Sequence, residues 1–257
     1  MNYDKYLSDR VKTLKPSGIR KFFDVAAAMP DCISLGVGEP NFVTPDNARE
    51  AAIESIKRGE TKYTSNSGIL ELREAIVRYL KERFDLSYSI NDIIITVGVS
   101  EALDNALRAL INFGDEVLIP EPCFVSYAPC VTLAGGVPVS LPCTADNGFI
   151  LTKELLEEYI TDKTKLLFVP FPSNPTGGIM TKEELEDIAP VIIENDLIVL
   201  SDEVYAELTY GDKKHVSIAS IPGMKERTIV FNGFSKAFAM TGWRIGFAAA
   251  PSPIAAQ

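Results

Sequence analysis

Apolar and polar positions form two patterns that alternate along most of this chain. In the first, apolar residues recur every three or four positions, as they do on one face of a helix. This pattern predicts a helix over about 45–58, where Pro45 takes the first helical position after Thr44 and Gly59 follows the last turn. It predicts further helices over 69–84, 100–112 and 181–195.

The second pattern consists of short apolar runs rich in β-branched residues, which begin after residue 92. The predicted strands are 93–97, 117–119, 137–139, 166–169, 197–200, 228–231 and 245–248. Because these runs are apolar on both faces and are separated by helices, they indicate a mostly parallel sheet with helices on both sides. We therefore expect an α/β fold with a doubly wound, mostly parallel seven-stranded sheet. Ligands of such sheets bind beyond the carboxyl ends of the strands.

The first part of the chain does not follow this alternation. We assign residues 1–45 to an N-terminal arm and part of a smaller domain, and residues 46–257 to a large, ligand-binding domain. Hydrophobic residues make up 46% of the 257, which is enough for a large buried core.

Charge and hydropathy narrow the range of partners. The chain has 25 Lys and Arg against 35 Asp and Glu, a net charge of −10, which argues against nucleic acid and anionic lipid as partners. No apolar run approaches the roughly 18 residues that a membrane helix needs, and Asp4 and Asp9 interrupt any signal-peptide core. We expect a soluble cytoplasmic protein.

Cysteine and histidine limit the chemistry further. The four cysteines, Cys32, Cys123, Cys130 and Cys143, include no CxxC pair. With His215 as the only histidine, we expect no metal site and interpret the cysteines as buried free thiols. A Ser or Cys hydrolase would have to use His215 as its base, so acid–base chemistry falls more readily on a lysine, a tyrosine or a carboxylate.

The first predicted strand ends in Gly98-Val-Ser-Glu-Ala102 and turns directly into a helix. Free backbone N–H groups and the Ser100 hydroxyl at a helix start are suited to binding an anion. Two plainer interpretations stay open, a tight turn at Gly98 and an N-cap at Ser100. The segment also resembles the nucleophile elbow of hydrolases, but Ala102 stands where that motif needs glycine.

Two further strands deliver polar side chains to the same edge of the sheet. Asn174 follows the 166–169 strand between prolines, although turn chemistry alone could explain it. Asp202 ends the 197–200 strand and Tyr205 comes three residues later, one turn away if a helix begins there. A carboxylate at the end of a buried strand implies a positively charged partner, because burial disfavours an unpaired charge.

The 228–231 strand leads to Lys236, which has Phe234, Phe238 and Trp243 nearby in sequence, and then to Arg244. Apolar surroundings can make a lysine nucleophilic, and arginine suits phosphate. Taken singly, a lysine with its stem on an apolar surface and a structural arginine are equally good interpretations. Taken with the strand-end groups, the set matches the needs of pyridoxal phosphate, which requires a Schiff-base lysine, an acidic partner for the pyridine nitrogen and an anchored phosphate.

On these motifs the sequence resembles the class I/II aminotransferases of the pyridoxal-phosphate fold-type-I superfamily. Within them it is similar to bacterial aspartate and aromatic aminotransferases that carry the Ser-Lys-Ala-Phe-Ala-Met-Thr-Gly-Trp-Arg-Ile-Gly segment of residues 235–246. Further matches lie at 36–42, 61–64, 98–102, 174–177 and 201–205, so that they span nearly the whole chain.

The resemblance implies a role for each matched residue. Lys236 forms the Schiff base, Asp202 pairs with the pyridine nitrogen, and Asn174 and Tyr205 bond the phenolic oxygen. The remaining implied contacts are Ser100, Glu101, Ala102, Ser235 and Arg244 for the phosphate, Phe124 stacked on the ring, and Gly38, Phe124 and Asn174 for the substrate. Tyr63 reaches the phosphate of the neighbouring subunit, which implies a homodimer. An L-amino acid and a 2-oxo acid such as 2-oxoglutarate are the implied substrates.

Three departures from the family pattern matter. Gly233 stands where many relatives have a phosphate-binding serine, and Phe124 replaces the tryptophan common in aspartate-specific members, which leaves substrate preference open. The resemblance also implies that the sequence as given, which stops at Gln257, lacks the C-terminal small domain and its carboxylate-binding arginine, unless a longer native protein supplies them. We therefore expect the chain to bind cofactor through Lys236 but to transaminate poorly on its own.

Other functions compatible with the same residues are β-elimination or racemisation on the same cofactor and a fragment with little activity. The effector domain of a transcription regulator is a further alternative, but residues 1–45 supply no basic DNA-binding unit.

Overall fold

The computed structural model describes residues 1–14, 18, 25–26, 28–29, 31, 33 and 38–257. From residue 46 onward, two α-helices precede the first strand, and one α-helix lies between each successive pair of the first five strands. The α-helices of the described residues are α1 (Asp9–Thr13), α3 (Asp46–Lys57), α4 (Leu70–Phe84), α5 (Val99–Leu110), α6 (Tyr127–Ala134), α7 (Lys153–Tyr159), α8 (Lys182–Glu194) and α9 (Ser252–Ala255). The strands are β1 (Ile93–Thr96), β2 (Glu116–Glu121), β3 (Val137–Pro142), β4 (Thr164–Val169), β5 (Ile198–Asp202), β6 (Thr228–Gly233) and β7 (Gly246–Ala249).

The described strands form one seven-stranded sheet in the order β1-β7-β6-β5-β4-β2-β3. All neighbouring pairs are parallel except those of β7, which runs antiparallel to both β1 and β6. The other six strands therefore point in one direction, and their carboxyl ends share one edge. The predicted fold class and each of the seven predicted strands are confirmed.

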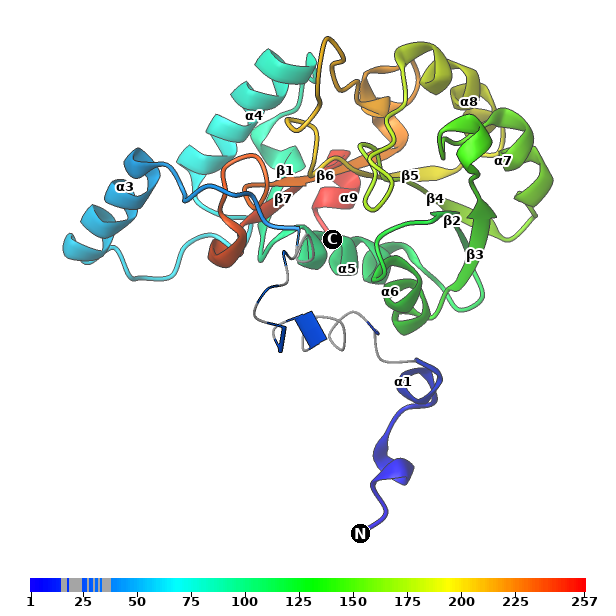
Figure 1. Cartoon of the computed structure of the whole chain (residues 1–257), viewed down its shortest axis with the longest axis horizontal. Helices are drawn as coiled ribbons and strands as arrows, with labels where there is room; N and C mark the ends of the chain where they lie inside the picture. The colour runs from blue at the N-terminus through cyan, green and yellow to red at the C-terminus, as the bar shows by residue number, and fades with distance from the viewer. Residues whose placement is uncertain (15–17, 19–24, 27, 30, 32, 34–37) are drawn as a thin grey trace.

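Alternate residues of the strands point to opposite faces, and each face is covered by helices (Figure 1). On one face, Leu118 and Leu167 pack in a cluster with residues of α7 and α8. On the other, Ile119 and Phe168 pack in a cluster with residues of α5 and α6. This alternation explains why the strand sequences are apolar throughout, and it makes the sheet a rigid support for groups at its carboxyl edge.

A third cluster attaches α4 beside the β1 end of the sheet, through Ile76 and Leu80 against Ile93 and Phe247. Helix α3, in contrast, has no buried residue and projects from the body of the molecule (Figure 1). The N-terminal residues lie beside α6, where the Arg10 guanidinium donates a 2.6 Å hydrogen bond to the carbonyl of Leu133.

Some predicted boundaries were wrong by a residue or two. Pro45 is the N-cap of α3 rather than its first residue, since the helix begins at Asp46. Gly98 is the N-cap of α5, which leaves Ser100 inside the first turn rather than at the cap. Tyr205 lies in a turn and not one helical turn beyond Asp202, because the chain turns back through the Ala206 N–H, which bonds the Glu203 carbonyl.

The free thiols differ in exposure. Cys143 is buried, but Cys123 and Cys130 are only partly buried. Among the described cysteines, the expectation of a buried thiol was therefore correct for Cys143 alone. Cys32 lies outside the described residues. Burial raises the pKa of Cys123 to about 12, which disfavours the reactive thiolate. No helix in the described part of the chain has the length and apolar character needed to span a membrane.

Candidate active site

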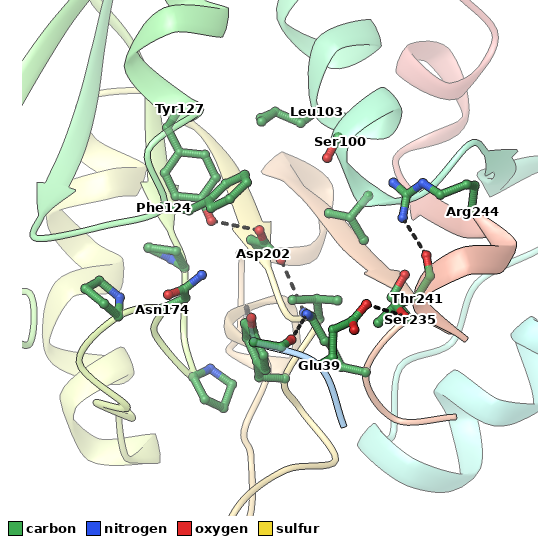
Figure 2. A pocket seen from close by; sticks show the side chains of 18 residues that line it. Glu39, Ser100, Leu103, Phe124, Tyr127, Asn174, Asp202, Ser235, Thr241 and Arg244 are labelled. Atoms are coloured by element: carbon green, nitrogen blue, oxygen red, sulfur yellow. Dashed lines mark hydrogen bonds between the residues drawn. The ribbon is translucent and has the colours of Figure 1, made fainter. Parts of the chain in front are cut away.

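The carboxyl ends of β4, β5 and β6 meet the start of α5 around a cavity of about 610 Å³. Side chains from these elements and from residues 38–39 converge on it (Figure 2). Residues predicted for the site that line this cavity are Gly38, Ser100, Phe124, Asn174, Asp202, Tyr205, Ser235, Lys236 and Arg244. The sheet therefore gathers residues that are up to about 200 positions apart in the chain.

Asp202 ends β5 and presents its carboxylate to the cavity. The Tyr127 hydroxyl donates a 2.7 Å hydrogen bond to Oδ2, and the Val204 N–H donates a 3.2 Å bond to Oδ1. Burial raises the pKa of Asp202, and these two donors act in the opposite direction by stabilising the charged form. Asp202 forms no ion pair with any described residue, so its charge is available to a cationic ligand.

Tyr127 owes its position to aromatic packing. Its ring stacks on Phe168 of β4 at 4.5 Å between centroids and meets Phe124 edge-on at 5.6 Å. The side chain is buried at 3% exposure, and burial raises its pKa well above the ordinary tyrosine value. Tyr127 therefore acts as a neutral hydrogen-bond donor to Asp202.

The residue after Asp202 anchors the end of β5 from inside the protein. Glu203 is fully buried and accepts hydrogen bonds from Ser201 at 2.8 Å and Ser217 at 2.5 Å, both on Oε1. Its Oε2 lies 2.8 Å from Nε2 of His215. The only histidine is thus paired with a buried carboxylate and does not line the cavity, which removes the base that a hydrolase would need.

Lys236 follows β6 and extends its amine into the cavity. Its Nζ donates to the carbonyl of Gly38 and lies 5.7 Å from the centre of the Tyr205 ring. Burial lowers the pKa of Lys236, the nearby Glu39 carboxylate raises it, and Arg244 lowers it again, with a net lowering. A lysine with a lowered pKa carries a larger fraction of neutral amine, the form that attacks carbonyl groups.

The opposite end of the cavity presents cationic and backbone donors. Gly98 has a φ of +75°, and a Cβ at this position would lie 2.4 Å from Nη2 of Arg244. The guanidinium therefore lies against the bare backbone of the turn that begins α5. Its Nη1 donates a 3.0 Å bond to the Thr241 carbonyl (Figure 2). With Ser100 in the first turn of the helix, this end can bind an anion.

Close backbone packing explains the glycine that departs from the family pattern. A Cβ on Gly233 would lie 3.0 Å from Cα of Gly246 and 3.1 Å from the Ile245 carbonyl oxygen. A Cβ on Gly246 would lie 2.6 Å from the backbone of Gly98 and Val99. Strands β6 and β7 and the turn before α5 therefore approach too closely for a serine at position 233 without local movement.

Three predicted site residues do not line this cavity. Glu101 and Ala102 follow Ser100 in the first turn of α5, and the Glu101 carboxylate accepts a hydrogen bond from the Val97 N–H. Tyr63 is fully exposed, at 108%, and does not line the cavity of its own chain.

Tyr127, Glu39 and Thr241 were not among the residues predicted for the site. Each lines the cavity, and Thr241 donates a 3.0 Å hydrogen bond to Oε1 of Glu39. Tyr127 could have been suspected from its place three residues after Phe124, in a stretch that returns to the sheet. Glu39 lies within the family match at 36–42, but no pattern indicated its contact with Thr241, which spans about 200 residues.

The sheet and its cavity define an α/β protein whose ligand site gathers a lysine, a carboxylate and an anion-binding helix start at one sheet edge. Comparison with known proteins narrows this class. The family described as aminotransferase class I and II matches residues 30–257. The chain therefore belongs to the aminotransferase class I and II family.

Individual relatives agree with this assignment. The chain is 53% identical to the aspartate aminotransferase of Pyrococcus abyssi, over 96% of this chain and 64% of that protein. It is 50% identical to the aromatic-amino-acid aminotransferase 2 of Thermococcus litoralis, over 95% and 63%. The solved structure of Thermus thermophilus aspartate aminotransferase with maleate matches with a TM-score of 0.92 at 39% identity, over 97% and 66%. The chain thus spans slightly less than two thirds of the length of the curated relatives it matches.

Proposed function

We propose that this chain is the cofactor-binding part of a pyridoxal-phosphate-dependent aminotransferase. The enzyme transfers an amino group from an L-amino acid to a 2-oxo acid such as 2-oxoglutarate. The single observation that carries the proposal is the cavity in which the Lys236 amine, the Asp202 carboxylate and the Arg244 guanidinium converge. Family membership supports the same conclusion.

The chemistry of the cavity fits this cofactor at both of its ends. Arg244 and the backbone at Gly98 suit a phosphate, because the turn lacks a side chain that would fill the space. Asp202 suits a protonated pyridine nitrogen, because it is a partly buried carboxylate with two donors and no cation among the described residues. Phe124 offers an aromatic face between the two ends, and Asn174 and Tyr205 offer donors for the phenolic oxygen.

When bound, pyridoxal phosphate supplies a conjugated ring that accepts electrons from the substrate's α-carbon. Lys236 would hold the cofactor through Nζ, and its amine lies in the cavity where it could take a proton from the α-carbon of a bound substrate. Its lowered pKa favours the neutral amine required for both tasks. Asp202 would pair with a protonated ring nitrogen, and the Tyr127 hydroxyl orients Asp202 and favours its ionised form.

The substrates proposed are aspartate, an aromatic amino acid or a similar L-amino acid, since relatives named for both activities are about equally similar to the chain. We assign residues 1–45 to an N-terminal arm with part of a small domain and residues 46–257 to the cofactor-binding domain. We place the enzyme in the cytoplasm, because its described cysteines are free thiols, as is usual in a reducing compartment.

A homodimer is part of the proposal. Tyr63 is fully exposed, so it is free to reach the cavity of a second subunit. Helix α3, just before it, exposes Ile53 at 52% and Ile56 at 70% and buries no residue in its own chain. Apolar side chains exposed together on one helix are typical of an interface.

The test is absorbance after addition of pyridoxal phosphate, followed by an assay for loss of 2-oxoglutarate with alanine, aspartate or phenylalanine. Wild type should develop the visible band of a lysine-bound cofactor, and Lys236→Ala should lose this band and at least about 10²-fold in turnover. Asp202→Asn should keep the cofactor but lose about 10²–10³-fold in turnover.

A fully active Lys236→Ala protein would overturn the proposal. Normal turnover in Asp202→Asn would remove only the role of that carboxylate. Products of β-elimination or racemisation without consumption of 2-oxoglutarate would replace transamination by a different reaction on the same cofactor.

A further inference from the structure

Residues 234–245, which we call the active-site loop, connect β6 to β7 and carry Lys236 and Arg244. The loop has two cavities beside it. Ser235, Lys236, Thr241 and Arg244 line the active-site cavity. A second cavity of about 490 Å³ is lined by Phe234, Phe238, Met240 and Ile245 of the loop, together with Pro45, Asn47, Ala48 and Leu72. Because open space borders the loop on both sides, packing alone does not hold it in place.

The backbone of the loop is also strained. Ala239 has a φ of +50° and Arg244 a φ of +58°, conformations that disfavour residues with a Cβ by about 1–2 kcal/mol each. Internal bonds are long at this point, for example 3.3 Å from the Ala239 N–H to the Lys236 carbonyl. A strained loop beside open space needs an external contact to keep one conformation.

Thr44 supplies that contact from a distant part of the chain. Its hydroxyl donates a 2.7 Å hydrogen bond to the carbonyl of Ala239 and accepts a 3.0 Å bond from Nε1 of Trp243. Thr44 is 7% exposed and is the one buried residue in the segment 38–44, whose Phe42 and Val43 are exposed. A single hydroxyl thus uses both its donor and its acceptor capacity on the active-site loop.

The position of Thr44 also explains why it does not cap α3. Threonine before a helix ordinarily accepts a bond from the first turn, but the N-cap of α3 is Pro45, and no side chain caps this helix. The Thr44 hydroxyl is directed to the loop instead. Thr241 of the loop also donates a hydrogen bond to Glu39, which lies five residues before Thr44. The loop is therefore held to residues 38–44 at more than one point.

We propose that Thr44 is a positioning residue, whose hydroxyl clamps the active-site loop through Ala239 and Trp243 so that Lys236 and Arg244 face the same cavity. The effect on cofactor binding rests on the function proposed above, but the clamp itself does not. Trp243 is the only tryptophan of the chain, so its fluorescence reports on the clamp without any cofactor.

The experiment compares Thr44→Val, which keeps the shape but removes the hydroxyl, with Thr44→Ser, which keeps the hydroxyl. In Thr44→Val the indole N–H loses its partner, so the Trp243 side chain should become more exposed to water. Its emission should therefore shift to the red, and acrylamide should quench it more strongly. The dissociation constant for pyridoxal phosphate should rise about tenfold, equivalent to about 1.4 kcal/mol. Thr44→Ser should stay within about twofold of wild type in both measurements.

Unchanged emission in a folded Thr44→Val protein, or a Thr44→Ser protein as impaired as Thr44→Val, would overturn the clamp. If no variant and no wild type binds pyridoxal phosphate, the proposed function fails, while the emission data still test the clamp. Should Thr44→Val not fold, Trp243→Phe removes only one of the two bonds. It should weaken cofactor binding by about threefold, and wild-type affinity in it would also contradict the proposal.

Discussion

Burial and a polar neighbour act in opposite directions on two ionisable groups of the cavity, Asp202 and Lys236. Asp202 is a clear case, since burial favours its neutral form and the Tyr127 hydroxyl, at 2.7 Å, favours the charged form. A carboxylate that is to attract a cationic ring nitrogen has to stay ionised. Tyr127 therefore matters to the site in two ways, because it lines the cavity and also holds the Asp202 carboxylate.

Removal of that hydroxyl gives the first prediction. In Tyr127→Phe the pKa of Asp202 should rise further, so its attraction for the cofactor should weaken. We expect a rise of about tenfold in the dissociation constant for pyridoxal phosphate, measured by absorbance titration, because hydrogen bonds to charged groups contribute about 1.5–3 kcal/mol. Tyr159→Phe on α7 is the control and should bind like wild type. Equal affinity of both variants would contradict the role of Tyr127.

The sequence was sufficient to predict some of these residues and not others. Lys236 and Asp202 could be predicted because each directly follows a strong strand signal, and parallel strands bring their carboxyl ends together. Tyr127 was marked only by its place three residues after Phe124, because its position depends on the start of α6, a short helix that is apolar on most sides and lacks helical periodicity. The contact of Thr44 with Trp243 spans 199 positions, so no local pattern indicated it.

At the scale of elements, the segment 203–217 forms the first part of the connection from β5 to β6 and holds Tyr205 beside the cavity. Two carboxylates fix it. Glu203 bonds His215 within the segment, and Glu207 accepts hydrogen bonds from Tyr79 at 2.9 Å and from the Arg83 guanidinium of α4. The second contact attaches the segment to α4, which packs on the β1 end of the sheet.

The Glu207 contact predicts a pH dependence of stability. Its bond with Arg83 lowers the pKa of Glu207 below the ordinary value of 4.5, so the folded protein favours the charged form. The resulting stability is present above the unfolded-state pKa and is lost as pH falls through the lowered folded pKa. Glu207→Gln should therefore lower the free energy of unfolding by about 0.5–1 kcal/mol at pH 7 and by progressively less as the pH falls toward and through the lowered pKa of Glu207.

Urea unfolding at pH 7 and pH 3 measures this difference. The matched control is Glu186→Gln, which breaks an exposed 3.5 Å pair with Lys182 on α8 and should change stability little at either pH. If Glu207→Gln lowers the free energy of unfolding by the same amount at pH 7 and pH 3, the charge of Glu207 is not what holds the segment.

Elements were more predictable than their ends. The seven strands could be found because both faces of the sheet are covered, which makes their sequences apolar throughout. The start of α5 was misplaced by one residue because Gly98, with its positive φ, takes the capping position, so that the helix begins at Val99 and not at Ser100. The turn at Tyr205 depends on a backbone bond between Ala206 and Glu203, which the side-chain pattern does not record.

For the whole molecule, the proposed homodimer makes a prediction about α3. Ile56 is 70% exposed, and helix α3 buries no residue in its own chain. Replacement of Ile56 by Asp should weaken association, because a charge would be placed in an apolar interface. Sedimentation velocity should show a dimer for wild type and a larger monomer fraction for Ile56→Asp at equal concentration.

Ile193→Asp, at an exposed isoleucine of α8, is the matched control and should leave the dimer intact. A wild type that sediments as a monomer over the whole concentration range, with cofactor present, would contradict the proposed homodimer and the assignment of Tyr63 to a neighbouring site. Loss of association in both variants alike would show a general defect in folding and not an interface at α3.

The central claim is that Lys236 forms a covalent bond to pyridoxal phosphate in the cavity at the carboxyl edge of the sheet. Borohydride converts the bond between Nζ and the cofactor's aldehyde carbon into a stable amine, and peptide mass mapping then identifies the lysine that carries it. We predict one cofactor per chain, attached to the peptide that contains Lys236. Attachment to a different lysine, or a reduced protein without bound cofactor, would contradict the account.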